Sequence, residues 1–397
     1  MPVSLPQKSL FDLPEGVIYL DGNSLGVLPK GAVEAAQKVI QDDWGGQLIR
    51  AWNSAGWMDL PRVVGDRIAG LIGAPAGSVA TGDTLSIKVY QALAAALDLR
   101  PERKVVLSDA GNFPSDLYIA QGLLDTMGRG HVLKTPNPED VVAAISDDVA
   151  VVMLTQVDYR TGRMHDMQAI TARAHEVGAV VIWDLAHSAG AVPVDLTGCN
   201  AEFAVGCTYK YLNGGPGAPA FIYVRPDLVQ VIRPALAGWL GHDAPFAMEP
   251  NYRPAMSTER MRVGTPAILQ LAVLQQALTV WNDMDMADLR AASIRLSELF
   301  ITEVERRCPD LTLVSPRDPK NRGSQVSFAF EHGYAAMQAL IDLGVIGDFR
   351  APNIMRFGFT PLYVDEDDVV AAAERLEEVM RENLWQNPKY QTVSRVT

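Results

Sequence analysis

Short apolar runs alternate with stretches of helical periodicity through the middle of the chain, from residue 78 to residue 226. The apolar runs are continuous, which is typical of strands that are buried on both faces of a sheet. They predict strands at 104–107, 149–154, 179–183, 203–207 and 220–224. The stretches between them predict helices at 86–97, 115–127, 138–145 and 167–176. Strands separated by helices indicate an α/β fold, with a mainly parallel sheet covered by helices.

The pattern differs on either side of this region. Before it, apolar spacing predicts helices at 31–40 and 61–72. After it, the spacing predicts helices at 265–281, 286–307 and 365–380, with strand-like runs at 311–314 and 325–330. We therefore expect an N-terminal segment, 1–55, packing with a smaller α+β domain, 281–397, and a large domain, 56–280, between them.

Composition narrows the classes of function. A chain of 397 residues, with 48% apolar and 20% charged residues, is an ordinary globular protein large enough for two domains. A net charge of −13 without clustered Lys and Arg argues against nucleic acid as a partner. The three cysteines lack metal-ligand or disulfide spacing, and no HExxH motif occurs, so no metal site is expected.

No targeting segment is evident in the sequence. The N-terminus lacks the apolar core of a signal peptide, and no run approaches the about 18 apolar residues of a membrane span. We expect a soluble cytoplasmic protein with no membrane partner.

The residue with the most specific chemistry is Lys210. It lies between two tyrosines, after an apolar run and before the glycine-rich residues 213–217. Asp184 ends the preceding apolar run, and the carboxyl ends of neighbouring parallel strands lie at one edge of a sheet. A lysine that forms a Schiff base and a carboxylate that keeps a pyridine nitrogen protonated are what pyridoxal phosphate needs. A structural lysine at a turn is the alternative.

Three further positions carry candidate chemistry. Residues 81–86 (TGDTLS) precede a helix and form either an anion cradle or an ordinary helix cap. His187 follows Asp184 by three residues and is either a site residue or a hydrogen-bonded core histidine. Arg356 lies in an apolar strand-like segment, where a substrate carboxylate or a salt bridge would compensate its charge.

With these residues in place, the chain resembles the kynureninases, pyridoxal-phosphate enzymes of tryptophan breakdown with the aspartate-aminotransferase fold (fold type I). The resemblance runs from residue 19 to residue 363. Its specific stretches are residues 19–26 (YLDGNSLG), 112–116 (NFPSD), 184–187 (DLAH) and 208–213 (TYKYLN).

The resemblance implies a role for individual residues. Lys210 would carry the cofactor and move protons as the catalytic base and acid, Asp184 would pair with the ring nitrogen, and Tyr209 would bind phosphate and act as an acid. The other cofactor contacts it implies are Leu85, Ser86, Phe113, Pro114, Ser115, Asp116, Thr155, His187, Trp239 and Thr265. Trp239 and Thr265 match positions that reach the cofactor from a second subunit, which implies a homodimer with its active site at the interface. Substrate contacts would be Arg356, for the α-carboxylate, and Ser24, Trp57 and Gly264.

The implied reaction is the hydrolysis of L-kynurenine to anthranilate and L-alanine by cleavage of the Cβ–Cγ bond. Animal members carry a histidine in the N-terminal loop and a Ser-Asn pair, whereas this chain has no histidine at 43–50 and has Gly264 and Thr265. This resembles the bacterial type and implies a preference for L-kynurenine over 3-hydroxykynurenine.

Three rival functions remain at this point. An aminotransferase would use the same Lys, Asp and Arg. A cysteine desulfurase would need a reactive thiol on a mobile loop, whereas Cys308 lies at the predicted end of a helix. A catalytically inactive relative would have no need to keep Lys210, Asp184, Tyr209 and Arg356 together.

Overall fold

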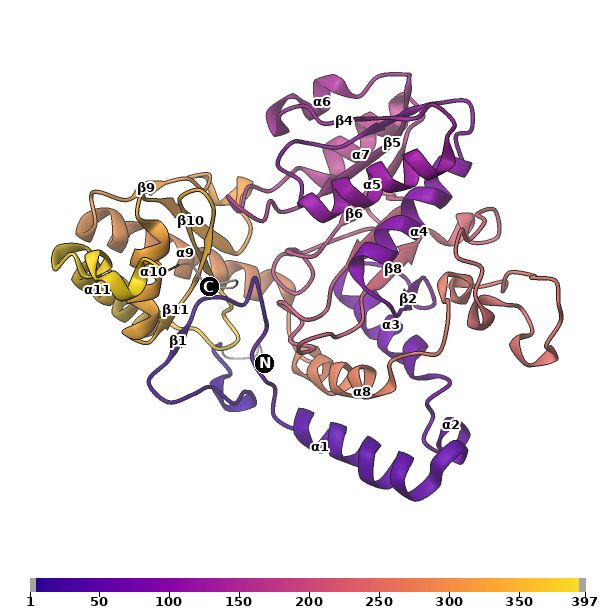
Figure 1. The fold of residues 1–397 in the computed structure, drawn as a ribbon, viewed down its shortest axis with the longest axis horizontal. Helices are drawn as coiled ribbons and strands as arrows, with labels where there is room; N and C mark the ends of the chain where they lie inside the picture. The colour runs from indigo at the N-terminus through magenta and orange to yellow at the C-terminus, as the bar shows by residue number, and fades with distance from the viewer. Residues whose placement is uncertain (1–4, 393–397) are drawn as a thin grey trace.

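A computed structural model of the chain describes residues 5–392 and contains two lobes (Figure 1). The larger lobe is built on a seven-stranded sheet with the order β2-β8-β7-β6-β5-β3-β4. Strands β4, β3, β5, β6 and β7 are parallel. Strand β8 runs antiparallel to β7 and to its other neighbour β2, so β2 has the same direction as the parallel strands. The strands are β2 (Val79–Thr81), β3 (Val105–Leu107), β4 (Val132–Lys134), β5 (Val149–Thr155), β6 (Val180–Asp184), β7 (Phe203–Gly206) and β8 (Phe221–Val224). The mainly parallel α/β sheet expected from the sequence is confirmed.

Helices cover both faces of this sheet because its side chains alternate between two apolar cores. In β6, Val181 and Trp183 belong to one core, whereas Val180 and Ile182 belong to the other. The covering helices are α3 (Leu60–Leu71), α4 (Leu85–Asp98), α5 (Pro114–Met127), α6 (Val141–Ala144), α7 (Met167–Glu176) and α8 (Ile268–Ala277). Helices α4 and α5 pack on the second core, and α3, α7 and α8 pack on the first.

The smaller lobe is an antiparallel sheet, β12-β13-β10-β9, covered by helices. Phe300 on its longest helix packs against Phe328, Phe357 and Phe359 of the sheet side, with ring centroids 4.8–6.2 Å apart. Its elements are α9 (Met286–Arg307), β9 (Thr312–Leu313), β10 (Gln325–Ala329), α10 (Gly333–Asp342), β11 (Val345–Ile346), β12 (Asp348–Arg350), β13 (Ile354–Gly358) and α11 (Glu366–Arg381).

The N-terminal segment contacts both lobes. Strand β1 (Ile18–Tyr19) pairs in parallel with β11, and Lys8 forms ion pairs with Asp365 and Asp368 at the start of α11. Helix α1 (Ala32–Lys38) then packs against α8 and continues as a π-helical segment, Val39–Gly45. With α2 (Ala51–Ser54), this region extends away from the body of the molecule (Figure 1).

The smaller lobe holds a loop of the larger one in place. The hydroxyls of Ser315 and Ser327 and the amide of Gln325 donate to the carbonyls of residues 161, 160 and 159, at 2.5, 2.7 and 3.1 Å. These bonds fix residues 159–161 beside the end of β5. A large-domain loop is therefore positioned by small-domain side chains.

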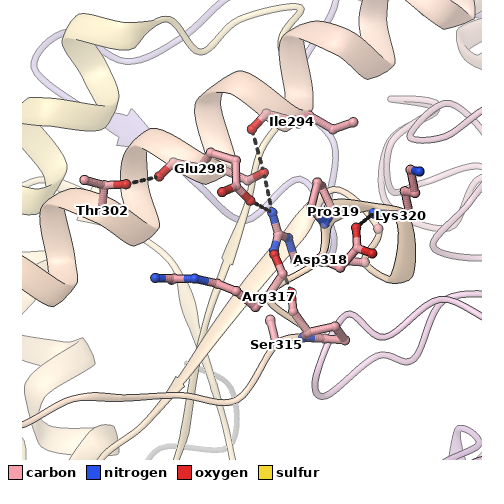
Figure 2. A network of polar contacts seen from close by, with 12 residues as sticks. Ile294, Glu298, Thr302, Ser315, Arg317, Asp318, Pro319 and Lys320 are labelled. Carbon is pink, nitrogen blue, oxygen red and sulfur yellow. Dashed lines mark hydrogen bonds and ion pairs between the residues drawn. The ribbon is translucent and has the colours of Figure 1, made fainter.

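The loop that supplies Ser315 is itself fastened to α9 by a buried arginine. Arg322 donates to the carbonyls of Pro316 and Arg317, at 2.6 and 3.2 Å, and to the Ser297 hydroxyl and the Glu298 carboxylate, at 3.2 and 2.5 Å. Figure 2 shows Glu298 on α9 facing the loop that carries Ser315 and Arg317. Because the guanidinium is buried and paired on several sides, this loop is a rigid support.

Most predicted elements occur with shifted ends. Helices 167–176 and 286–307 are found at the predicted residues. The helix predicted at 138–145 is only a 3₁₀ turn followed by α6, and the one at 265–281 begins at Ile268. The elements that were not predicted are strands β1, β2, β4, β11 and β12 and helices α2 and α10. No helix within residues 5–392 is long and apolar enough to cross a membrane.

Candidate active site

Three predicted site residues lie where neighbouring parallel strands end. Thr155 is the last residue of β5 and Asp184 the last of β6, and the two are directly paired across the strands. Lys210 follows β7, the next strand in the sheet. The sheet topology therefore brings these residues to one edge, as predicted for Asp184 and Lys210. Thr155 had been named only through the resemblance.

The Nζ atom of Lys210 lies 2.9 Å from Nε2 of His187. Its backbone is held by the N-terminal segment, because the Gly26 amide donates to the Tyr209 carbonyl at 2.8 Å. A Cβ atom at Gly26 would lie 2.3 Å from the Lys210 carbonyl oxygen, so only glycine permits this approach. The lysine is therefore presented on a fixed backbone.

Asp184 is one of two buried carboxyl groups in contact. Its Oδ1 accepts from the Ala186 amide at 2.8 Å, and its Oδ2 accepts from the Thr155 hydroxyl at 3.4 Å. Burial raises the pKa of Asp184. Burial also raises the pKa of Asp116 well above its usual range, with the charge of Asp184 and a hydrogen bond to it adding to the effect. A positive charge nearby lowers both pKa values, as Lys210 does, so the pair suits a cationic partner.

His187 is buried and neutral at physiological pH. Burial lowers its pKa well below the usual value, and the positive charges of Lys210 and Arg356 lower it further. A neutral imidazole can form a hydrogen bond with the Lys210 amine without adding a second positive charge beside it.

Two helix N-termini meet beside this cluster. Ser86 in the first turn of α4 and Ser115 in the first turn of α5 lie with their hydroxyls 2.9 Å apart. Leu85 and Pro114 are the first residues of these helices. Pro114 has no N–H and the Asp116 amide donates to the Phe113 carbonyl at 3.0 Å, so the backbone donors left at this place are the Ser115 amide and the first amides of α4. This geometry is typical of a phosphate cradle.

Asn112 also contacts the site, although no role was predicted for it. Its Oδ1 accepts from the Thr155 hydroxyl at 2.5 Å and from the Phe113 amide at 2.7 Å, and its Nδ2 donates to Ser108 at 2.9 Å. It therefore couples the end of β5 to the loop bearing Phe113, whose ring lies edge-on to Tyr159 at 5.1 Å. The one signal that could have indicated it was its place in the stretch 112–116.

Arg356 is extensively engaged by protein groups. It lies in the centre of β13, is 1% exposed, and contacts Asp348, Ser24 and the carbonyl of Tyr159. The sequence left two alternatives for this arginine, a substrate carboxylate and a salt bridge, and the salt bridge is present. Ser24, also predicted to contact substrate, donates to Asp348 at 2.6 Å.

Three predicted site residues, Trp239, Gly264 and Thr265, form no hydrogen bond with the Lys210 side chain among residues 5–392. Trp239, Gly264 and Thr265 lie in the segment between β8 and α8, which projects to one side of the larger lobe (Figure 1). A Cβ atom at Gly238 would lie 2.2 Å from the Val263 carbonyl, so this segment folds back closely on itself. All three residues are exposed, Trp239 by 44%.

Trp239 lines an apolar cavity of about 450 Å³. The cavity is formed with Ile49, Trp52, Asn53, Met58, Leu240 and Phe246. Trp57 does not line it but packs edge-on against Trp52, with ring centroids 5.5 Å apart. Trp57 therefore supports the cavity only indirectly, by packing against Trp52.

The groups around Lys210 fit the cofactor that the resemblance implies. His187 Nδ1 and Asp116 Oδ2 are buried without a hydrogen-bond partner among residues 5–392. Such atoms are costly unless a bound group satisfies them. An amine, a carboxyl pair and two converging helix N-termini match the carbonyl, ring nitrogen and phosphate of pyridoxal phosphate.

Comparison with known proteins gives one family. A family model described as the kynureninase C-terminal domain matches residues 289–376. A kynureninase from Pseudomonas fluorescens is 52% identical over 399 residues, covering 99% of this chain and 96% of its own. A kynureninase from Burkholderia pseudomallei is 49% identical, with the same coverage.

Solved structures at low identity share the fold. A cysteine desulfurase from Thermococcus onnurineus has a TM-score of 0.81 at 18% identity, covering 96% of this chain and 100% of its own. A C-DES mutant with glycine covalently linked to its PLP cofactor has a TM-score of 0.80 at 19% identity, covering 94% and 99%. These similarities extend over both lobes.

Proposed function

The chain belongs to the kynureninase family, and on this premise we propose how its own residues carry out the cleavage of kynurenine. The protein is a pyridoxal-phosphate enzyme that hydrolyses L-kynurenine to anthranilate and L-alanine. The observation that supports the residue assignment is the meeting of Lys210, His187 and the Asp116–Asp184 pair at one edge of the sheet.

Pyridoxal phosphate, when bound, supplies an electron sink for negative charge that develops on the carbon atoms of the substrate. We assign its carbonyl to Lys210 and its ring nitrogen to Asp184. Ser86, Ser115 and the amides of the two helix N-termini would hold its phosphate together with Tyr209.

Two side chains move protons. Lys210 takes the proton from Cα of the substrate and returns it, with neutral His187 at 2.9 Å as the hydrogen-bond partner of its amine. Burial raises the pKa of Tyr209, so its phenol stays protonated at neutral pH and can donate to Cβ. Water supplies hydroxyl to the aryl ketone carbon and hydrogen to the alanine side, which balances the hydrolysis.

Cysteine desulfurase activity is not supported, although the fold is shared. Such a reaction needs an accessible thiol with a lowered pKa. Burial raises the pKa of Cys308 to about 12 and also raises the pKa of Cys207 and Cys199. Cys308 and Cys207 are buried.

The discriminating experiment against an aminotransferase uses kynurenine as the only organic substrate. We expect the cofactor-loaded enzyme to form anthranilate and alanine in equal amounts without added keto acid, measured by anthranilate fluorescence and amino-acid analysis. Product formation that depends on a keto acid would contradict the assignment.

We also propose that the enzyme is a homodimer whose active sites lie between subunits. Large apolar side chains are exposed on the two projecting regions that line the apolar cavity, Ile49 by 77% and Phe246 by 62%. Exposed apolar groups gathered in this way are typical of an interface. Trp239, Gly264 and Thr265 would then approach the Lys210 site of the partner, and the apolar cavity would become part of the aryl pocket.

A mixed dimer tests the shared site. Lys210→Ala and Trp239→Ala homodimers are each expected to be nearly inactive. A heterodimer of the two, purified by two different tags, should regain about half of the wild-type activity, because one of its two sites has both intact residues. A heterodimer as inactive as its parents would mean that each site is complete within one chain.

Three narrower proposals each have their own support. The preference for L-kynurenine over 3-hydroxykynurenine is supported by Gly264 and Thr265, and the cytoplasmic location by composition alone. The division into 1–55, 56–280 and 281–397 is supported by the pairing of β1 with β11, although α1 packs against α8 of the larger lobe.

A further inference from the structure

Asp348 and Arg356 form a buried cross-strand ion pair. They are directly opposite in the register of β12 and β13, and each side chain is 1% exposed. Asp348 accepts from Arg356 Nε at 2.5 Å and also from Nη2, so the carboxylate occupies the whole side edge of the guanidinium. These two bonds fix both the position and the orientation of the Arg356 guanidinium.

The other contacts of Arg356 leave little of it free. A guanidinium carries five N–H donors. Nε and one hydrogen of Nη2 go to Asp348, the other hydrogen of Nη2 goes to Ser24 Oγ at 2.9 Å, and one hydrogen of Nη1 goes to the Tyr159 carbonyl. A substrate carboxylate therefore finds one remaining N–H on Nη1 and gains a second only by replacing Ser24.

Asp348 is the ionised carboxylate of this cluster. Burial alone would raise its pKa, but the hydrogen bond and charge of Arg356 outweigh burial, and the pKa is lowered. The neighbouring Asp21 differs, because burial and then the charge of Asp348 raise its pKa to about 7. Arg350 also reaches Asp348, at 2.8 Å.

We propose that Asp348 is a positioning residue for the reaction, which holds the side edge of Arg356 so that only the end edge, Nη1 and Nη2, meets the substrate carboxylate. The Ser24 hydroxyl accepts the hydrogen bond from Nη2 until the substrate carboxylate takes its place. The inference rests on the proposed role of Arg356 as carboxylate receptor. Asp348 thereby sets the direction from which the substrate carboxylate approaches Arg356, and hence the placement of the substrate Cα near Lys210.

Two opposing effects decide which kinetic constant should respond. Loss of the Asp348 charge strengthens the attraction of Arg356 for a carboxylate, whereas loss of its fixed direction weakens the contact. Affinity is thus expected to change by less than about tenfold. The rate should fall more, because a misplacement of about 1 Å can cost about 100-fold.

The test compares Asp348→Asn and Asp348→Glu with the wild-type holoenzyme. Both variants should lose about 100-fold in kcat per cofactor-loaded site, while KM for kynurenine moves less than about tenfold. The Glu variant keeps the charge but displaces it, so it should not restore kcat. The matched control is Glu202→Gln, a buried carboxylate held by Arg225 and His175 at 2.8 and 2.9 Å near the opposite end of β6, which should keep wild-type kcat.

Binding of L-alanine and L-alaninamide, measured by calorimetry, separates this inference from the proposed function. Wild type should prefer the carboxylate-bearing ligand, and a wild type that does not would refute the role of Arg356 itself. If that preference holds and Asp348→Asn keeps kcat within about threefold, or Asp348→Glu restores it, Asp348 does not position the arginine. An equal loss in Glu202→Gln would also overturn the inference.

Discussion

Replacement of Lys210 by alanine should reduce kcat by at least about 10³-fold while the protein stays folded. A positioned acid–base group contributes about 10²–10⁴-fold, and the same amine also anchors the cofactor. The side chain is only partly buried and its amine is paired with His187, so its loss should leave the core intact. Steady-state kinetics with thermal unfolding of the same sample measures both effects.

The matched control for this experiment is Lys134→Ala. Lys134 is an exposed lysine at the end of β4, the edge strand of the sheet, and pairs with Asp148 at 3.0 Å; β3 lies between it and β5. It should retain wild-type kcat. Normal turnover in Lys210→Ala would show that Lys210 is not the catalytic base.

Replacement of Asp184 by asparagine should lower kcat by about 100-fold. An amide has the size of the carboxyl group but cannot hold a ring nitrogen in its protonated form. A hydrogen bond to a charged group contributes about 1.5–3 kcal/mol, and about 1.4 kcal/mol corresponds to tenfold in rate. The measurement is kcat per bound cofactor, so that weaker cofactor binding is not mistaken for slower chemistry.

Asp166→Asn serves as the control for this change. Asp166 caps α7 through the Ala169 amide at 2.9 Å, and it lies outside the site. Its replacement can alter stability slightly but should not change kcat. Wild-type kcat in Asp184→Asn would show that the ring nitrogen has another partner.

The elements with strong local signals were predictable from the sequence. Helices α7 and α9 start after the capping residues Asp166 and Asp285, and both were predicted at their observed ends. Strand β4 is partly exposed and β2 has only one strongly apolar residue, Val79, so neither shows the continuous apolar run that indicated the equally short β3. Helix α10 begins without a side-chain cap, so nothing local marks its start.

The site was predictable only where chain topology alone determines it. Asp184 ends β6 and Lys210 follows β7, two neighbouring strands of the parallel part of the sheet, so their placement at one edge needs no knowledge of side-chain packing. The pairing of Asp348 with Arg356 depends on the register of two antiparallel strands, which the sequence does not reveal. Trp239 and Thr265 matter only if a second chain is present.

Hydrolysis of an aryl-keto amino acid at this edge of the sheet can be followed by mass spectrometry. The sample is anthranilate formed by the wild-type holoenzyme from kynurenine in H₂¹⁸O, without keto acid. We expect one ¹⁸O atom in the anthranilate carboxylate and an equal amount of alanine, with both products reduced by at least about 10³-fold in Lys210→Ala. Anthranilate without ¹⁸O, or no anthranilate unless a keto acid is added, would contradict this expectation.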